Sequence, residues 1–403
     1  MTARADGVGS PCDRLVLVSD LHLGGGAEAA AAGSWFTDPT DGDEAFVEFL
    51  AHLRRRQDAN RHRLVLLGDT LDFLRVPVAG RRAGLYARND AEAIGQLERI
   101  HTAHSAVFDG LADLLTVAGG VDLVAGNHDV ELARPAVRAR LRTLLRDRHG
   151  CQPRALASLR FHPWGYHVPG LLYAEHGNHY HDINRFERPL YPFRRKGLVE
   201  RPPAARLGGL RRLAAGRPSS VRLRDGLADL VPRRRADSAA RSTYAYLLNE
   251  YADQVGLDVD VVGRLHRMGE TSALRIARRL LRSRITGGPT YADQLPEIAA
   301  AVHGVLTAHG QGVQFYVFGH VHVAQHLRLP GAAACYLNTG TWSTDGTMRR
   351  TWVEIITGRT CSPTAALLRW IGGPVELPGP GDGRTGEAKE TGVDAFTDTT
   401  ASA

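Results

Sequence analysis

Residues 15–22 read LVLVSDLH, an apolar run of strand length that ends in a polar tip. The same order recurs in LVLLGD at residues 64–69 and in VDLVAGNHD at residues 121–129. Segments with the apolar spacing of helices, residues 44–56 and 90–116, separate these runs. Strands that alternate with helices predict an α/β fold with a largely buried sheet.

The second half of the chain contains two more runs of this kind, LLYAEHG at residues 171–177 and VQFYVFGHVH at residues 313–322. Between them the pattern changes, because residues 185–235 are rich in Arg, Pro and Gly. Helices are expected at residues 243–255, 271–284 and 295–309, and late strands at residues 335–337 and 351–356.

These patterns divide the chain into an enzyme core that an insertion interrupts. Residues 15–200 and 311–375 are predicted to form the core, and residues 201–310 an Arg-rich and helical insertion that caps it. Residues 1–14 are expected to be a flexible N-terminus. Residues 376–403 are rich in Gly, Thr, Asp and Glu, which predicts a disordered tail.

The composition of the 403-residue chain is that of a globular protein with a basic surface. Its net charge of +7 favours anionic partners such as phosphate esters, nucleic acid or acidic lipid headgroups. The four cysteines are far apart and form no CxxC pair, so neither a zinc ribbon nor a disulfide framework is indicated. A reducing, cytoplasmic location follows as the simplest expectation.

No membrane-spanning or secretory segment is expected from the sequence. Residues 1–14 lack the apolar stretch of a secretory signal, and no run of about 18 apolar residues occurs anywhere. Contact with a membrane would therefore be peripheral, through basic residues and anionic headgroups.

Metal-binding side chains follow each of the five apolar runs: Asp20, His22, Asp69, Asn127, His176, His320 and His322. In open α/β sheets, sites form at the carboxyl ends of the strands. Because strand side chains alternate, residues two apart can point the same way, which suits the D-x-H and H-x-H pairs. Oxygen and nitrogen ligands without a thiolate suit Mn, Fe or Zn better than Ca or Mg alone.

Taken in order, the motifs D-x-H, G-D-x-x-D, G-N-H-D, H-G and G-H-x-H resemble those of the calcineurin-like metallophosphoesterase family. Here they occupy residues 20–22, 68–72, 126–129, 176–177 and 319–322. The resemblance spans residues 15–360 apart from the Arg-rich helical segment. It implies a four-layer αββα sandwich with a helical cap insertion, and two divalent metal ions, of which Mn fits best and Fe or Zn are alternatives.

The resemblance also assigns roles to the residues. One metal would be held by Asp20, His22, Asp69 and His322, and the other by Asp69, Asn127, His176 and His320. Asp69 would bridge the two, together with a water or hydroxide that acts as the nucleophile. His128 would act as the general acid at the leaving group or stabilise the phosphoryl charge, and Asp72 would accept a hydrogen bond from it.

Several assignments leave alternatives open. His176 is preferred over His179 and His181 because the ligand of the family precedes Gly. Asp182 and Asn184 are candidate substrate contacts, or else they cap the following segment. His128 could orient neighbouring groups without transferring a proton. His101 and His104 have helical spacing without a visible ligand partner, so they are expected on a solvated helix face.

The G-H-x-H spacing and the helical insertion are similar to those of the UDP-2,3-diacylglucosamine hydrolase branch. That branch carries Arg after the Asn of the third motif, whereas this chain has His128. The departure counts against the lipid precursor of that branch and favours a general phosphoesterase with a histidine acid. The first hypothesis is a hydrolase of a phosphorylated small molecule or of a lipid-linked phosphoester or pyrophosphate. A nuclease or phosphodiesterase acting on nucleic acid is the alternative, and a non-catalytic scaffold is disfavoured because every ligand is kept.

The Arg-rich stretch has two interpretations. Its basic runs could contact an anionic membrane, a nucleotide or nucleic acid, or they could belong to a solvated connector. The runs are residues 194–196, 211–212 and 233–235.

Overall fold

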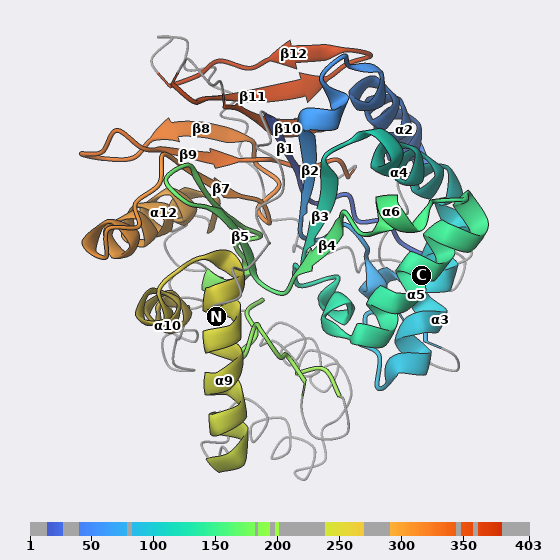
Figure 1. Cartoon of the computed structure of the whole chain (residues 1–403), viewed down its shortest axis with the longest axis horizontal. Helices are drawn as coiled ribbons and strands as arrows, with labels where there is room; N and C mark the ends of the chain where they lie inside the picture. The colour runs from blue at the N-terminus through green and yellow to red at the C-terminus, as the bar shows by residue number, and fades with distance from the viewer. Residues whose placement is uncertain are drawn as a thin grey trace, which may run out of the picture.

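The structure is a computed structural model, and Figure 1 shows how its strands and helices are arranged. It describes residues 14–26, 40–78, 83–181, 184–193, 198–200, 238–269, 291–343, 348–357 and 362–380. The described strands form two mixed sheets, and the described helices lie beside them. The predicted α/β fold class is thereby confirmed.

The larger sheet has seven strands in the order β12-β11-β10-β1-β2-β3-β4. Strands β1 to β4 run parallel to one another, and β10 pairs antiparallel with β1. The bounds are β1 Arg14–Val18, β2 His62–Leu67, β3 Gly120–Val124, β4 Leu159–His162, β10 Thr351–Ile356, β11 Thr364–Trp370 and β12 Pro374–Glu376.

The smaller sheet has five strands in the order β5-β6-β7-β9-β8. Its three central strands are parallel, and the two edge strands are antiparallel to their neighbours. The bounds are β5 Gly165–Val168, β6 Leu172–Glu175, β7 Phe315–Phe318, β8 Gln325–Arg328 and β9 Cys335–Asn338.

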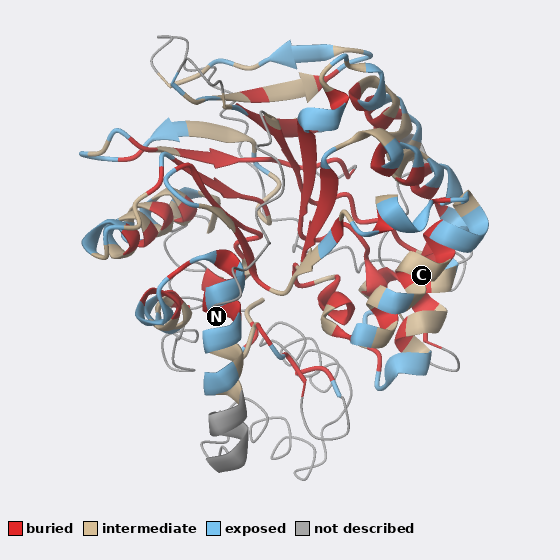
Figure 2. Cartoon of the chain, in the orientation of Figure 1, coloured by how far each residue is buried: buried red, intermediate tan, exposed pale blue. Residues whose placement is uncertain are grey.

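Both sheets are buried on both faces at their centres, because apolar side chains point to both sides of each central strand. In β1, Leu15 and Leu17 pack between the two sheets, while Val16 and Val18 pack on the opposite side. In β7, Phe315 and Val317 face the same inner core. Figure 2 shows these central strands as the most continuously buried part of the molecule. Such double burial explains why the central strands read as unbroken apolar runs.

Helices cover the outer face of the larger sheet. Their apolar side chains share one hydrophobic cluster with the outward residues of β1, β2 and β3. The bounds are α2 Thr40–Arg55, α3 Asp90–Ala103, α4 Ser105–Val117, α5 Pro135–His149 and α6 Pro153–Leu156. Short 3-10 turns at Ala59–Arg61, Phe73–Arg75, Val130–Ala133 and Asn178–Tyr180 complete the connections.

A second helical layer covers the outer face of the smaller sheet, on the other side of the molecule in Figure 1. It consists of α9 Ser238–Val255, α10 Val259–Met268 and α12 Tyr291–Ala308. Apolar residues of these helices share a cluster with Tyr173, Tyr316 and Tyr336 of the sheet. None of the described helices is both long and apolar enough to cross a lipid bilayer.

The helical pattern of residues 90–116 is confirmed, and the segment forms two helices, α3 and α4, that meet at His104. The expectation that His101 and His104 are solvated is wrong, because both are buried. His101 lies against His149 of α5, with their Nε2 atoms 2.6 Å apart. His104 contacts Asp43 and the backbone of Gly24. These partners are distant in sequence, so helical spacing could not reveal them.

Several other expectations fall outside the described residues. These are the helix at 271–284, the three Arg runs, residues 1–13 of the N-terminus and residues 381–403 of the tail. Cys12 and Cys361 are outside as well. Cys151 and Cys335 lie within the described part of the chain and are free thiols.

Candidate metal centre

The predicted ligands lie on loops that follow neighbouring strands. Asp20, Asp69 and Asn127 follow β1, β2 and β3, which are adjacent in the larger sheet. His176 and His320 follow β6 and β7, which are adjacent in the smaller sheet. The carboxyl ends of parallel strands meet at one edge of a sheet, so this topology gathers the side chains.

The alternation of strand side chains is the wrong reason for this gathering. β1 ends at Val18 and β7 ends at Phe318, so both ligand pairs lie beyond their strands. Five predicted ligands instead have a left-handed backbone, with positive φ at Asp20 (55°), His22 (53°), Asp69 (49°), His320 (72°) and His322 (57°). Non-glycine residues rarely adopt this conformation, and they do so mainly where function demands it.

Backbone hydrogen bonds between the loops hold this conformation in place. The amide of Asp20 donates to Gly68 O at 3.1 Å, and the amide of His22 donates to Asp69 O at 2.9 Å. The amide of His320 donates to Asp20 Oδ2 at 2.9 Å, which joins the two sheets at the site. These hydrogen bonds tie the loops after β1, β2 and β7 to one another.

Two glycines allow the loops to approach this closely. A Cβ on Gly126 would overlap the Asp69 carboxylate and lie 2.6 Å from the Asp69 amide nitrogen. A Cβ on Gly68, whose φ is 86°, would lie 2.5 Å from the His176 ring. Any side chain at either position would push the ligand loops apart.

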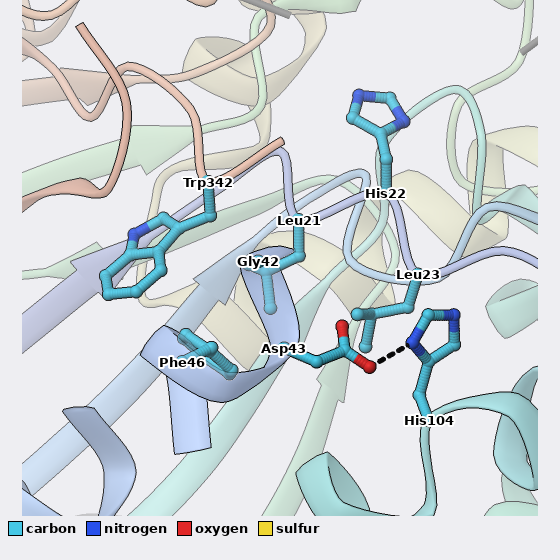
Figure 3. Close-up of a pocket in the computed structure, with 8 residues that line it drawn as sticks. All are labelled: Leu21, His22, Leu23, Gly42, Asp43, Phe46, His104 and Trp342. Carbon is cyan, nitrogen blue, oxygen red and sulfur yellow. Dashed lines mark hydrogen bonds and ion pairs between the residues drawn. The ribbon is translucent and has the colours of Figure 1, made fainter. Parts of the chain in front are cut away.

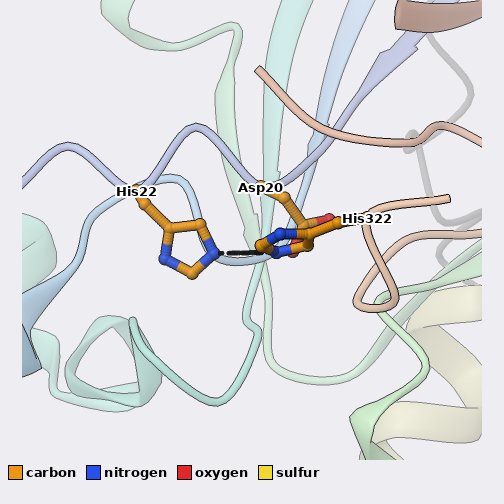
Figure 4. A group of neighbouring side chains, drawn as sticks. All are labelled: Asp20, His22 and His322. Carbon is orange, nitrogen blue, oxygen red and sulfur yellow. Dashed lines mark hydrogen bonds and ion pairs between the residues drawn. The ribbon is translucent and has the colours of Figure 1, made fainter. Parts of the chain in front are cut away.

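The first group of ligands consists of Asp20, His22 and His322, whose donor atoms lie within 4.8 Å of one another. Asp20 Oδ1 is 3.2 Å from His322 Nε2 and 3.7 Å from His22 Nε2. Figure 4 shows the three side chains converging from two separate loops. His22 Nδ1 lies 2.9 Å from Asp72 Oδ2, so Nε2 is the nitrogen left for a cation.

The second group consists of Asp69, His176 and His320, again within 4.8 Å of one another. His176 Nε2 lies 3.1 Å from Asp69 Oδ2. Its Nδ1 donates to Leu67 O at 3.0 Å, which fixes the tautomer and leaves the Nε2 lone pair directed at the group. Asp69 Oδ2 is also 4.0 Å from His22 Nε2, so one carboxylate stands between the two groups.

In the described part of the chain, three buried atoms at these groups make no hydrogen bond of good geometry: Asp20 Oδ1, Asn127 Oδ1 and His176 Nε2. Ion-pair contacts alone reach two of them, from His322 to Asp20 Oδ1 and from Asp69 to His176 Nε2. Buried polar atoms are normally satisfied, and an unmatched one calls for an ion or a water. All three are good ligands for a divalent cation. Together with the mixed oxygen and nitrogen donors of the two groups, they fit metal ions.

The electrostatics of the site favour positive charge. Burial alone would raise the pKa of Asp20, but His176 and His322 hold it well below its usual range. Burial likewise opposes ionisation of Asp69, yet His176 and His128 lower its pKa. Ionised, buried carboxylates attract a cation, and protons on the histidines compete with it for the same donor atoms.

His128 stands beside the first group and contacts Asp72. Its Nδ1 lies 2.9 Å from Asp72 Oδ2, within ion-pair distance but poorly aligned for a hydrogen bond. Burial would lower the pKa of His128, and the charges of Asp72 and Asp69 outweigh it and raise the pKa. Asp72 also accepts from the Arg75 amide at 3.1 Å, so its carboxylate joins His22, His128 and the turn that follows β2.

The rival histidines have different surroundings. His179 is buried away from both groups, and its Nε2 donates to His266 O at 3.1 Å. His181 Nδ1 lies 2.8 Å from His320 Nε2, next to the second group. The amide nitrogen of Asn184 lies 3.1 Å from His181 Nδ1 and 3.4 Å from His320 Nε2. Asp182 lies outside the described residues.

A small hollow borders the first group, and Figure 3 shows its lining. The lining is largely apolar and consists of Leu21, His22, Leu23, Gly42, Asp43, Phe46, His104 and Trp342. His104 Nδ1 lies 2.6 Å from Asp43 Oδ2, and its Nε2 lies 3.0 Å from Gly24 O. Through these two contacts the ring ties the ligand loop to α2.

No motif role was predicted for Asp129, although its carboxylate supports the site. Asp129 accepts from the amides of Gly126 at 2.6 Å and Thr70 at 2.9 Å, and so joins the loops after β2 and β3. Its position in the G-N-H-D motif is the sequence feature that could have identified this role. Tyr291 was also missed, because no motif includes it, and it stacks on His181 with ring centroids 4.1 Å apart.

No protein-family model and no curated protein sequence matches this chain. Among solved structures, it is similar to the crystal structure of phosphopantetheinyl hydrolase (PptH) from Mycobacterium tuberculosis, with 11% sequence identity. The match covers 82% of this chain and 91% of that chain, with a TM-score of 0.26. At this TM-score and identity the likeness does not establish a shared activity.

Proposed function

We propose that the chain is a dinuclear, metal-dependent hydrolase of phosphoester or pyrophosphate bonds with a calcineurin-like sandwich fold. The position of Asp69 is the observation that carries the proposal. Its Oδ2 lies 3.1 Å from His176 Nε2 and 4.0 Å from His22 Nε2, between two groups of donor atoms. A carboxylate between two such groups can bridge a pair of cations.

Asp20, His22, Asp69 and His322 would hold one cation, and Asp69, Asn127, His176 and His320 the other. We propose Mn, with Fe and Zn as alternatives that the same donors suit. Two bound cations would supply a hydroxide nucleophile near neutral pH and neutralise charge on the phosphoryl group. The protein's part is to hold the donors in place through the left-handed loops and the bonds to Leu67 O and Asp72.

His128 is proposed to give a proton to the leaving-group oxygen. Asp72 would orient the ring through Nδ1, which leaves Nε2 to face the substrate. The side chain of His128 is 21% exposed while Asp72 is fully buried, so His128 alone of the pair can reach a substrate from solvent. Phosphoryl transfer depends mainly on positioning and charge stabilisation, and a proton donor adds to both.

The substrate class we propose is a phosphorylated small molecule or a lipid-linked phosphoester. The cap role of residues 201–310 belongs to this proposal, with α9, α10 and α12 as its described part. Asn184 is retained as a proposed substrate contact because its amide lies within hydrogen-bond distance of His181 beside the second group. A cytoplasmic protein with at most peripheral contact to a membrane is consistent with this substrate.

The test is hydrolysis of a generic aryl phosphate by metal-free and Mn-loaded protein, followed by a panel of monoesters, diesters and nucleotide-sugar pyrophosphates. Activity should require Mn and should vanish in Asp69→Ala, whose shared ligand is gone. Asp113→Ala is the matched control, because Asp113 is an exposed helix residue whose carboxylate contacts Arg54. Metal-independent activity, or full turnover in Asp69→Ala, would refute the proposal.

A further inference from the structure

The second ligand group touches the helical layer that the insertion contributes. Tyr291, the first residue of α12, stacks on His181 with ring centroids 4.1 Å apart and planes 11° from parallel. The Tyr291 hydroxyl donates to Gly177 O at 2.8 Å. Gly177 directly follows the proposed ligand His176 and has a φ of 106°. One aromatic side chain thus contacts the loops of both His176 and His320.

The bond between His181 and His320 decides which nitrogen of His320 remains for a cation. Nε2 of His320 faces His181 Nδ1 at 2.8 Å. A histidine that binds a metal through one ring nitrogen donates from the other, so Nε2 of His320 would carry the proton and Nδ1 the free lone pair. His181 must then accept at Nδ1. The amide nitrogen of Asn184, at 3.1 Å from the same atom, also requires an acceptor there.

Stacking on Tyr291 is what fixes the His181 ring in this orientation. The ring planes are nearly parallel, and Tyr291 is itself held by its hydroxyl bond to Gly177 O. The Tyr291 ring also meets His320 edge to face, with centroids 5.7 Å apart. Rotating His181 away would remove the acceptor and leave the tautomer of His320 undetermined.

We infer that His181 and Tyr291 are positioning residues that make cation binding at the second group depend on helix α12. The inference rests on the proposed function, because it takes Asp69, Asn127, His176 and His320 as the ligands of one cation. In the first group, by contrast, the His22 ring is oriented by Asp72, which belongs to the larger sheet's own loops. Displacement of α12 should therefore weaken cation binding at the second group and leave the affinity of the first group unchanged.

The experiment is a calorimetric titration of the full-length, metal-free protein with MnCl2, with Co(II) absorption as a spectroscopic check of ligand geometry. His181→Leu should weaken one of the two binding steps by about 10–100-fold, the usual effect of losing a group that orients a ligand. His181→Asn should recover most of the loss, because its side chain offers an acceptor near the position of Nδ1. Tyr291→Leu should weaken the same step, and Tyr246→Leu, on an exposed face of α9, should change neither.

Two further variants, each lacking a ligand of one group, show which group has the weakened binding step. In His22→Ala the second group keeps all its ligands, so adding His181→Leu should weaken the remaining step. In His176→Ala the first group is intact, and adding His181→Leu should leave the remaining step unchanged. Unchanged affinities in His181→Leu would overturn the inference, as would an equal loss at both steps with a lower unfolding midpoint. Wild-type protein that binds fewer than two Mn ions would instead overturn the proposed function, and the inference would fall with it.

Discussion

The two residue groups of the candidate metal centre are held in different ways. In the first group, Asp20 and His22 are fixed by backbone bonds to Gly68 and Asp69, within loops of the larger sheet. In the second group, His320 depends on the side chains of His181 and Tyr291. Asp20 and His22 are therefore held by the loops of the larger sheet, whereas the orientation of His320 also depends on how α12 packs.

This difference has a general lesson about how an insertion can control a site. The strands that supply His176 and His320 are as buried as those that supply Asp20 and Asp69. Only the side-chain contacts around the ligands differ. An element that packs on one group can thus change the affinity of one cation without altering the sheets.

After the loss of all activity in Asp69→Ala, the largest effect we expect is on turnover, and it tests the role of His128 beside the first group. His128→Ala should lower turnover by about 10²–10⁴, the usual contribution of a general acid. The loss should be smaller for an aryl ester than for an alkyl ester, because an aryl leaving group needs little protonation. Steady-state kinetics on matched aryl and alkyl substrates would measure this. Equal losses for both would exclude the acid role and leave His128 as an orienting group.

The next largest effect should be a loss of Mn affinity at the first group, which corresponds to the loss expected for His181→Leu at the second group. Asp72→Ala removes the carboxylate that lies 2.9 Å from His22 Nδ1, so the first group should lose about 10–100-fold in Mn affinity. The second group should keep its affinity, as measured by the same titration. If Asp72→Ala and His181→Leu weaken the same step, the two groups are not independent and the comparison fails.

A third prediction concerns the close approach of the loops, which both groups need. Gly126→Ala would bring a Cβ to 2.6 Å from the Asp69 amide nitrogen. Overpacking of this kind costs about 1–3 kcal/mol in the free energy of unfolding, measurable by denaturant titration. Gly95→Ala is the control, because a Cβ there meets nothing within 4 Å inside helix α3. That variant should be neutral or slightly stabilising, since Ala favours helices.

The strands that position the site were predictable from sequence because they are buried on both faces. LVLV, LVLL and FYVF become β1, β2 and β7 almost residue for residue. Edge strands were missed, since half-exposed β8, with the sequence QHLR, carries no apolar run. Helix α5 was missed as well, because PAVRARLRTLLRDRH contains too many arginines to stand out.

The gathering of the ligands followed from topology, but their geometry did not follow from the sequence. Positive φ at Asp20 and Asp69 results from hydrogen bonds between loops, which residue spacing does not encode. The contacts of His104 with Asp43 and of His181 with Tyr291 join segments far apart in the chain. Such tertiary contacts decide whether a histidine is buried, and helical periodicity alone misjudged His104.

The smallest effect we expect is a pH dependence of the unfolding free energy, caused by a histidine near the second group. His179 lies three residues after His176, and its Nε2 donates to His266 O of α10 at 3.1 Å. Burial, together with the neighbouring His266, lowers the pKa of His179 to about 3. The folded protein therefore keeps this ring neutral, while the unfolded chain takes up a proton below about pH 6.5. Stability from this group is complete above pH 6.5 and is lost as the pH falls towards 3.

His179→Gln keeps a donor towards His266 O but cannot titrate, so it isolates this contribution. Between pH 7.5 and pH 5.5, wild type should lose about 1.4 kcal/mol more unfolding free energy than the variant. Burial raises the pKa of Glu131 to about 7 and acts in the opposite direction, but it is common to both proteins and cancels in the difference. Denaturant titrations at the two pH values measure that difference. Identical pH profiles would mean that the contact between His179 and α10 is equally stable with a neutral or a protonated ring. Acid would then not weaken the packing of α10 beside the second group.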